Sequence, residues 1–394
     1  MLPRVAFFPD SFHEVNGVAH TSRNFEAFAC RRGMPFLCVR AGTRADPLRR
    51  EDNLWTLELP RSRLAISIER DLSFDPAFSR HRDRIERVLR EFRPNLIHIT
   101  GPSELGFFGA YFAWKMNLPL VASWHTNVHE YAARRMRWIS RHLGNAGPAV
   151  EQWAQDRSLD GTTRFYRMAS VLYAPNPPLC EMLQHRTGRP CHLMQRGVDT
   201  GMFSPAKRAR APQDTQPVLG YVGRLSVEKN VDLLPRVNKE LRASGRSPRW
   251  LIIGHGADEA MLRRELGDSA MAGVLRGEEL ARAYASMDLL VFPSHTDTFG
   301  NVVLEALASG VPAIVTPHGG PAHIVQDGVT GRVARDEEFA GVIADLLGAP
   351  ERMQSMRCAA REYALGCTWD AVFERVVAAY PLAVAQLADV DAMR

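Results

Sequence analysis

The sequence has no long hydrophobic run and no closely paired cysteines. No window approaches the roughly 18 consecutive apolar residues of a membrane-spanning helix, which argues against a transmembrane segment. The N-terminus leads directly into a strand-like run, RVAFF, without a basic region followed by an apolar stretch. We therefore expect no secretory signal and a cytoplasmic location. The six cysteines are scattered and form no C-x-x-C pair, which favours reduced thiols over a disulfide framework.

Lysine is scarce in this chain. Four of the 49 basic residues are lysines, namely Lys115, Lys207, Lys229 and Lys239. The basic residues are concentrated in the first half: residues 1–200 hold 28 Arg or Lys against 20 Asp or Glu, while residues 201–394 hold 21 against 24. A basic half suits an anionic partner such as a phospholipid surface or a phosphorylated acceptor. An Arg-rich composition gives the same imbalance, so charge alone does not decide.

Composition and patterning indicate an α/β enzyme. The 394 residues suffice for two domains with full cores, and 45% apolar with 24% charged residues is ordinary for a globular enzyme. Short apolar runs alternate with helical patterns throughout, which predicts doubly wound parallel sheets. In the first half we expect strands near residues 4–8, 35–40, 96–99, 119–123, 171–174 and 191–195. We expect helices near residues 18–32, 74–92, 104–116, 127–142, 148–168 and 177–186.

One stretch interrupts this alternation. Residues 204–217, SPAKRARAPQDTQP, are rich in proline and charge and have no apolar periodicity, so we interpret them as a linker. Beyond the linker, four apolar runs restart the strand–helix pattern: VLGYVG, RWLIIG, DLLVFP and PAIVTP. The simplest architecture is two Rossmann-like domains, residues 1–203 and 218–366, on either side of the linker.

Two cations follow the first strand of the second domain. In GYVGRLSVEKNVDLL (220–234), Arg224 and Lys229 flank a loop at the carboxyl end of the strand, where open α/β sheets bind ligands. Fixed cations beside a helix N-terminus can clamp a diphosphate. The alternative is a pair of solvated charges in a surface loop. A role in ligand binding is favoured for Lys229, because lysine is rare elsewhere in the sequence.

Three further loops offer weaker signals. Gly17 opens the first expected helix, and a glycine there lets backbone N–H groups approach a phosphate or simply makes a turn. His125 directly follows an apolar strand and is expected to point into the cleft, whereas His129 is expected to pack within the next helix. The Gly254-x-Gly256 pair lacks the third glycine of a dinucleotide fingerprint, so we interpret it as a tight turn near a nucleobase.

A carboxylate lies inside an otherwise apolar helix of the second domain. HTDTFGNVVLEALASG (295–310) places Asp297 before the helix and Glu305 within it, four residues beyond Asn301 on the same face. Burial of an ionised Glu is costly unless it is hydrogen-bonded. Two carboxylates eight residues apart can hold two hydroxyl-bearing rings, with phosphates between them at the helix N-terminus, which we expect Thr298 to cap. A nucleotide-sugar has this arrangement of groups.

These motifs are similar to those of a known family. PSHTDTFGNVVLEALASGVPAIVT resembles the E-x7-E region of retaining GT-B glycosyltransferases of family four, and GRLSVEKN resembles their diphosphate clamp. VNGVAHT, SWHTN, RGVDTGMFSP and GGPAHIVQDGVTG are similar to other signatures of the family and occur in its order over nearly the whole chain. The resemblance is strongest to bacterial GDP-mannose-dependent α-mannosyltransferases and related glycolipid enzymes. In the family the last helix returns to the first domain, so we assign residues 367–394 to the N-terminal, acceptor-side domain.

The resemblance implies roles for the nucleotide-binding residues. Gly17 would approach the diphosphate, and Arg224 and Lys229 would bind its oxygens. Glu305 would hold the ribose hydroxyls. The reaction would proceed on the front face of the sugar, with the leaving diphosphate accepting the proton, and would need neither metal nor cofactor. The implied donor-binding residues are therefore Gly17, Arg224, Lys229, Phe299, Gly300, Asn301, Val302 and Glu305.

The resemblance also implies contacts to the donor sugar. Asp297 and the turn Phe299–Asn301 would hold the sugar, and His125 would reach its 6-hydroxyl side. Asp297 is one methylene shorter than the usual first Glu, and Ala322–His323 stand where many relatives carry an acid, which leaves that loop without an assigned role. The residues implied in catalysis are His125, Asp297, Arg224 and Lys229.

Several alternatives remain open from the sequence. The donor is GDP-mannose or a UDP-sugar, and the acceptor is a lipid or a glycan; we expect no nucleic-acid partner. A UDP-sugar-dependent glycolipid synthase is the nearest alternative, followed by a nucleotide-sugar epimerase and a non-catalytic nucleotide-sugar sensor. The stretch EYAARRMRWISRHL (130–143) combines cations with Trp138, which is typical either of a helix on an anionic membrane surface or of a solvated basic helix.

Overall fold

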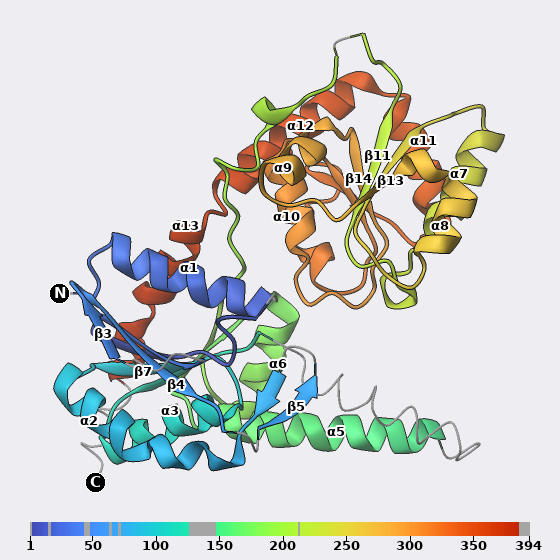
Figure 1. Cartoon of the computed structure of the whole chain (residues 1–394). Helices are drawn as coiled ribbons and strands as arrows, with labels where there is room; N and C mark the ends of the chain where they lie inside the picture. The colour runs from blue at the N-terminus through green and yellow to red at the C-terminus, as the bar shows by residue number, and fades with distance from the viewer. Residues whose placement is uncertain are drawn as a thin grey trace. The chain divides into compact units, whose positions relative to one another are not determined.

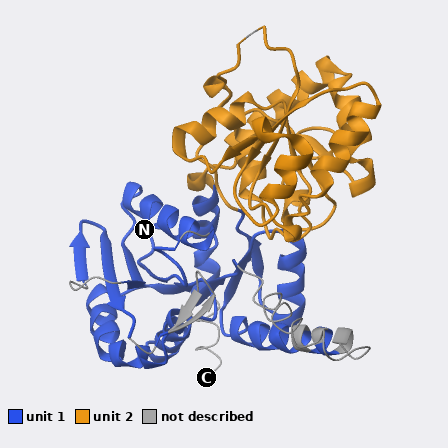
Figure 2. Ribbon diagram, turned by 45° about the vertical axis from the view of Figure 1, so that its right-hand side comes forward, with its two compact units in different colours: residues 1–195, 372–394 blue, residues 196–371 orange. Residues whose placement is uncertain are grey.

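The computed structural model describes residues 2–14, 17–42, 48–62, 65–69, 72–125, 147–211 and 213–385. The chain forms two compact units, one of residues 1–195 with 372–394 (unit 1) and one of residues 196–371 (unit 2) (Figures 1 and 2). Each unit contains a largely parallel sheet flanked by helices, so the predicted α/β class with two Rossmann-like units is confirmed.

Unit 1 is built on an eight-stranded sheet of order β10-β9-β8-β7-β1-β2-β4-β3. All neighbouring strands are parallel except β3 and β4, which pair antiparallel at the edge. The strands are β1 (Val5–Phe8), β2 (Phe36–Gly42), β3 (Leu48–Glu51), β4 (Leu54–Pro60), β7 (Leu96–Ile99), β8 (Leu120–Ser123), β9 (Val171–Ala174) and β10 (Cys191–Leu193). A separate antiparallel pair is formed by β5 (Ile66–Glu69) and β6 (Leu72–Phe74). β1, β7, β8 and β9 are buried along their whole length, as expected for strands covered on both faces.

Two helices of unit 1, α3 and α6, begin at side-chain caps. Ser103 accepts from the Gly106 N–H at the start of α3, and Asn176 accepts from the Leu179 N–H at the start of α6, where proline follows as the first helical residue. The helices are α1 (Gly17–Arg31), α2 (Arg82–Phe92), α3 (Glu104–Lys115), α5 (Gly147–Tyr166) and α6 (Pro177–Thr187), with a 3-10 turn η1 (Pro76–His81) before α2.

The C-terminal part of the chain is anchored in unit 1. Helix α13 (Trp369–Ala378) leaves unit 2 and enters unit 1 at residue 372. There the ring of Phe373 stacks on Phe25 with centroids 4.5 Å apart. The hydroxyl of Tyr380 lies 2.7 Å from Nδ1 of buried His98, and the Tyr173 hydroxyl donates to the Val376 carbonyl at 2.7 Å. These buried polar contacts tie the last described turns to the sheet of unit 1.

Unit 2 contains a six-stranded, wholly parallel sheet of order β13-β12-β11-β14-β15-β16. Its strands are β11 (Val218–Val222), β12 (Arg249–Ile253), β13 (Met271–Gly273), β14 (Leu289–Phe292), β15 (Ala313–Val315) and β16 (Gly331–Val333). Its helices are α7 (Leu233–Ala243), α8 (Glu259–Leu266), α9 (Gly277–Ser286), α10 (Asn301–Ala308), α11 (Phe339–Leu347) and α12 (Pro350–Leu365). Short 3-10 turns occur at η3 (Pro205–Lys207), η4 (Val227–Lys229), η5 (Asp268–Ala270), η6 (Gly320–His323) and η7 (Asp336–Glu338).

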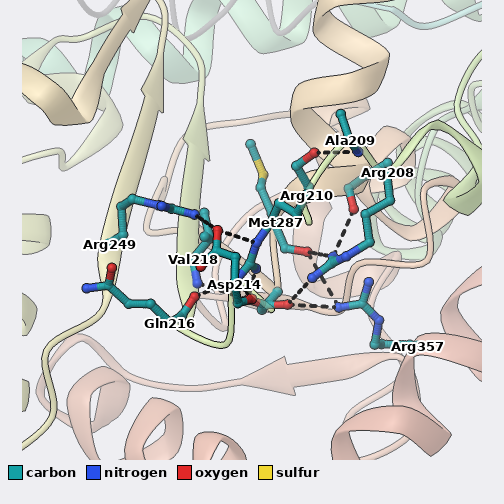
Figure 3. A network of polar contacts seen from close by, with 12 residues as sticks. Arg208, Ala209, Arg210, Asp214, Gln216, Val218, Arg249, Met287 and Arg357 are labelled. Atoms are coloured by element: carbon teal, nitrogen blue, oxygen red, sulfur yellow. Dashed lines mark hydrogen bonds and ion pairs between the residues drawn. The ribbon is translucent and has the colours of Figure 1, made fainter. Parts of the chain in front are cut away.

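The stretch that the sequence suggested as a linker is held against unit 2 (Figure 3). Arg208 donates to the Met287 carbonyl at 3.1 Å and pairs with Asp288 at 3.0 Å. Arg210 pairs with both Asp288, at 2.5 Å, and Asp214, at 3.2 Å. Residues 204–217 are therefore part of unit 2, which begins at residue 196, and do not form a free connection between the units.

Most elements outside the sequence prediction are short or exposed, and β4 is the exception. β3 reads LRRE and is largely solvent-exposed, so it carries no apolar signal. β13 and β16 have three residues each, too few for a periodic pattern. β4, LWTLELP, alternates apolar and polar residues but was not predicted. The helix expected at 127–142 falls within 126–146, outside the described residues.

Candidate functional site

The candidate site lies at the carboxyl ends of β11 and β14, the two central strands of unit 2. The chain proceeds from β11 outward to β12 and β13 on one side, and from β14 outward to β15 and β16 on the other. The order therefore reverses between β11 and β14. Open α/β sheets bind ligands in the crevice at such a switch point, beyond the carboxyl ends of the strands. Arg224 and Lys229 follow β11, and Asp297 follows β14, so both loops meet at this crevice.

Lys229 and Asp297 form an ion pair across the switch point. Nζ of Lys229, in η4, donates to Oδ1 of Asp297 at 2.8 Å, and the two side chains are only 19% and 22% exposed. The next residue, Asn230, adopts a left-handed conformation and donates from Nδ2 to the carbonyl of Pro293 at 3.2 Å. This bond ties the loop after β11 to the end of β14 and so fixes the position of Lys229.

Asn230 also belongs to a second polar cluster beside the ion pair. Its Nδ2 donates to Oδ2 of Asp336 at 2.8 Å, and Nε2 of His295 lies 3.2 Å from the same oxygen. His295 in turn packs its ring on His318 with centroids 5.3 Å apart. The sequence analysis did not find this cluster, because its residues follow three different strands and share no motif.

Arg224 has a different environment from Lys229. Its side chain is 69% exposed and pairs with Glu228, four residues later, at 3.2 Å. The Arg224 carbonyl accepts a hydrogen bond from the Tyr221 hydroxyl at 2.9 Å, which holds the main chain at the end of β11. The main chain at Arg224 is thus held in place while its side chain extends into solvent, which suits a group that reaches a ligand from the surface.

The turn between Asp297 and α10 differs from the expectation in one respect. The N-cap residue of α10 is Gly300, in the left-handed region with φ 96°, and not Thr298; Gly300 has no side chain with which to cap the first turn. An L-residue is strained at this φ, and a Cβ there would lie 2.9 Å from Pro321. The helix therefore starts at Asn301, and the N–H groups of its first turn favour an anion in front of them.

The glycine-rich loop after β15 packs on this turn. Gly320 donates its N–H to the Asp297 carbonyl at 2.6 Å, and a Cβ on Gly320 would lie 2.1 Å from the Thr298 carbonyl oxygen. Gly319 has φ 77°, and its Cβ would lie 2.8 Å from the same Asp297 oxygen. The loop that had no assigned role in the sequence therefore supports the backbone of the Asp297–Gly300 turn, and only glycine fits at these two positions.

Glu305 lies on α10 and is held by a tyrosine from the neighbouring helix. The hydroxyl of Tyr284, on α9, donates to Oε2 of Glu305 at 2.8 Å. Burial raises the pKa of Glu305 to about 7, and the Tyr284 hydrogen bond acts in the opposite direction. Tyr284 itself is fully buried, with its ring edge against Phe203. The expected hydrogen-bonded Glu is therefore present, but its partner was not identifiable from the sequence.

The Gly-x-Gly pair after β12 serves the close approach of two loops. A Cβ on Gly254, which has φ 143°, would lie 1.9 Å from the Gly223 carbonyl oxygen, and a Cβ on Gly256 would lie 2.0 Å from the Leu225 carbonyl oxygen. Leu225 also donates its N–H to the His255 carbonyl at 3.1 Å. These glycines let the loops after β11 and β12 pack together, which accounts for them without a direct ligand contact.

Two of the predicted site residues belong to unit 1. Gly17 is the first residue of α1, and its carbonyl accepts from the Thr21 hydroxyl at 2.9 Å. His125 lies two residues beyond the end of β8 and is 8% exposed. His129, expected within a helix, lies outside the described residues. The structure thus brings together the predicted residues of unit 2 and places Gly17 and His125 beside strand and helix ends of the other unit.

Comparison with known proteins supports the family seen in the motifs. The family model described as Glycosyltransferase Family 4 matches residues 15–201, and the model described as Glycosyl transferases group 1 matches residues 203–363. A GDP-mannose-dependent alpha-mannosyltransferase of Mycobacterium tuberculosis is 34% identical over 303 residues, which cover 75% of each chain. The chain belongs to the family 4 glycosyltransferases. A Corynebacterium glutamicum protein of the same name is 31% identical, over 75% of this chain and 69% of its own.

Solved structures show the same fold as this glycosyltransferase. Sucrose-phosphate synthase from Thermosynechococcus elongatus superposes with a TM-score of 0.69 at 17% identity, covering 98% of this chain and 100% of its own. WaaG, a glycosyltransferase involved in lipopolysaccharide biosynthesis, gives 0.61 at 16% identity, covering 95% and 98%. These neighbours confirm the GT-B fold. Across the described residues, no helix is both long and apolar enough to cross a membrane.

Proposed function

We propose that this glycosyltransferase moves mannose from GDP-mannose onto a hydroxyl of a lipid or glycan acceptor, with retention of the α configuration. The observation that carries the proposal is the arrangement at the switch point of unit 2, where Lys229, Asp297 and Glu305 lie on the loops and helix that follow β11 and β14. Both relatives named above are GDP-mannose-dependent alpha-mannosyltransferases, which supports this donor over others.

In this proposal the unit 2 residues hold the nucleotide diphosphate. Arg224 and Lys229 bind the diphosphate oxygens, together with the N–H groups at the start of α10 and the backbone at Gly17. Glu305 accepts hydrogen bonds from the ribose hydroxyls. Its Oε2 is already engaged by Tyr284, so Oε1 is the oxygen assigned to the ribose.

The sugar is assigned to the turn in front of α10. Asp297, whose Oδ2 is buried without a hydrogen-bond partner among the described residues, accepts from a sugar hydroxyl. The backbone of Phe299 and Gly300, with the side chain of Asn301 and the surface of Val302, completes the sugar contact. His125, at the end of β8, is assigned to the 6-hydroxyl side.

The reaction needs no protein nucleophile in this proposal. The bond between the anomeric carbon and the diphosphate oxygen breaks, and the acceptor oxygen bonds to the same face of that carbon. The acceptor proton passes to the departing diphosphate, which leaves as GDP. Lys229, Arg224 and the α10 N-terminus stabilise the negative charge that develops on that group, the task that a metal ion performs in other enzymes.

A sulfolipid-type transferase is the second candidate, because one relative points to it. The sulfoquinovosyl transferase SQD2 of Arabidopsis thaliana is 28% identical over 74% of this chain and 58% of its own. That enzyme's name implies a different sugar from mannose. The two candidates share the diphosphate and ribose contacts, so the sugar-binding turn around Asp297 would have to distinguish them.

A panel of GDP- and UDP-sugars tested for protection against thermal unfolding distinguishes the donors. A ligand that binds only the folded state stabilises it by mass action, so the preferred donor gives the largest rise in Tm at equal concentration. We expect GDP-mannose and GDP to stabilise the protein most. A larger rise with a UDP-sugar would show that this UDP-sugar, and not GDP-mannose, is the donor. In a separate assay with a radiolabelled donor, label recovered as a free epimerised sugar would show that the protein is an epimerase and not a transferase.

A further inference from the structure

Arg196 has no assigned role, yet it lies at the donor-site turn of unit 2. It is the first residue of that unit and belongs to the segment QRGVD. The chain is fixed immediately after it: Val198 donates its N–H to the Cys367 carbonyl at 3.0 Å. A Cβ on Gly197 would lie 2.5 Å from the main chain of Trp369, so this position accepts only glycine. The backbone that carries Arg196 is therefore held firmly in place.

The Arg196 side chain extends toward α10 and Asp297. Its guanidinium reaches Oδ1 of Asn301 in a long, 3.5 Å hydrogen bond, and it interacts electrostatically with Asp297. Desolvation lowers the pKa of Arg196 to about 10, which still leaves it charged at neutral pH. The amide oxygen of Asn301 carries no formal charge, so it does not neutralise this cation.

The charges around the turn do not balance. Arg196 and Lys229 both interact with the carboxylate of Asp297, whose single charge can neutralise one of them. The nearby carboxylate of Asp336 is held by Asn230 and His295. Glu305, with a pKa raised to about 7, is only partly ionised and is bound to Tyr284. A desolvated cation without a full counter-ion is unfavourable, and such groups in clefts are frequently matched by a charged ligand. These groups together are short of negative charge.

We propose that Arg196 is a third cation of the donor site, which binds the diphosphate of the nucleotide-sugar together with Lys229. The inference rests on the proposed donor site at this turn. Asp297 interacts with both cations, and Arg196 reaches the first residue of α10 through Asn301. A planar guanidinium offers two parallel N–H donors to a phosphate, and the first N–H groups of α10 face the same region.

Titration calorimetry with GDP and UDP on single variants tests this inference. Arg196→Gln removes the charge and is expected to weaken binding of the preferred nucleotide by about 10- to 100-fold, the usual contribution of a charge-assisted hydrogen bond. Arg196→Lys keeps the charge and is expected to recover part of the loss. The matched control is Arg335→Gln, which removes an exposed arginine paired with Glu338 in the same unit. It is expected to bind as wild type.

A purely structural role for Arg196 predicts a different pattern. If Arg196 only holds α10 in place, Arg196→Gln weakens binding of the matching nucleoside, which lacks the diphosphate, as much as it weakens binding of the nucleoside diphosphate. We expect Arg196→Gln to bind the nucleoside as wild type and the nucleoside diphosphate more weakly. Wild-type affinity for the diphosphate in a folded Arg196→Gln, or an equal loss for the nucleoside, overturns the inference. If Lys229→Gln and Glu305→Gln also bind as wild type, the donor site itself is wrongly placed.

Discussion

Tyr284 donates its hydroxyl hydrogen to Oε2 of Glu305 across 2.8 Å, and this bond joins α9 to α10 behind the candidate ribose site. Tyr284 is fully buried and cannot touch a nucleotide itself. The bond fixes which oxygen of Glu305 remains available and stabilises the ionised carboxylate against a burial that raises the pKa to about 7. A buried tyrosine on α9 therefore lowers the pKa of a carboxylate on the neighbouring helix, α10.

Tyr284→Phe is expected to shift the pH dependence of donor binding. The hydroxyl bond lowers the pKa of Glu305, so its loss raises that pKa further and protonates the carboxyl at higher pH. The acid limb of kcat/KM for the donor should move up by about one pH unit, equivalent to ~1.4 kcal/mol. The ring packing on Phe203 is retained, so the fold should survive, with a modest fall in Tm from the hydrogen bond lost at a buried carboxylate. Superimposable pH profiles for variant and wild type would contradict this coupling.

Removing the assigned nucleotide contacts should abolish most of the transfer. Glu305→Ala and Lys229→Ala delete the ribose and diphosphate contacts, and each is expected to lower kcat/KM by about 100-fold or more while the far-UV spectrum is unchanged. Arg224→Lys should also be impaired, because an ammonium cannot reproduce a two-pronged guanidinium contact. Near-wild-type turnover in folded Glu305→Ala or Lys229→Ala would refute the site assignment.

Activity is expected to persist in excess EDTA. The cations Arg224 and Lys229 and the α10 N-terminus are proposed to neutralise the leaving diphosphate, so no divalent ion should be required. The measurement is the initial rate after exhaustive dialysis against EDTA, with and without added Mg²⁺ or Mn²⁺. Loss of the rate that either ion restores would show that a metal takes part.

The basic stretch 130–143 is expected to promote binding to anionic membranes, although it lies outside the described residues. Each basic residue near an anionic surface contributes about 1 kcal/mol, so a few are enough for reversible docking. The protein should float with anionic but not neutral vesicles, and added salt or the combined Arg134/Arg135/Arg137→Ala change should release it. Recovery in the soluble fraction with every vesicle composition would favour a soluble acceptor.

The arginine cluster around Asp288 should be important for the stability of unit 2 (Figure 3). Arg208, Arg210 and Arg357 all pair with this carboxylate. Desolvation raises the pKa of Asp288, but hydrogen bonds from the Val218 N–H, Arg210 and Arg208 outweigh it and hold that pKa below the usual range. Asp288→Asn leaves the buried Arg210 without one of its charge partners and should lower the free energy of unfolding by about 3 kcal/mol.

Urea denaturation at two pH values measures this effect. The Asp288 pKa is lowered on folding, so its contribution is present at neutral pH and is lost as the pH falls through the folded value. The variant and wild type should therefore converge in acid. The control is Asp327→Asn, which removes an exposed partner of Arg332 and should cost less than about 1 kcal/mol. Equal losses for the two variants would show that the cluster has no special role.

The sequence determined the local chemistry of the molecule. Alternating apolar runs predicted the α/β class because parallel strands covered on both faces must be apolar throughout. Arg224, Lys229, Asp297 and Glu305 could be proposed as site residues because each lies at a strand end or in a short motif. The family followed from the same motifs, since they occur in order along the chain.

Tertiary structure alone decided which distant residues meet. Arg196 lies 105 positions before Asn301, and Tyr284 lies 21 positions before Glu305, so no local period relates either pair. Gly300 rather than Thr298 caps α10, because the glycine loop packs on the turn too closely for another geometry. Residues 204–217 resemble a linker in the sequence, because Asp288, the carboxylate partner of Arg208 and Arg210, is far away along the chain and close to them only in the folded structure. Hydrophobic periodicity specifies elements, whereas charge pairing across a parallel sheet depends on strand order, which the chain fixes only when it folds.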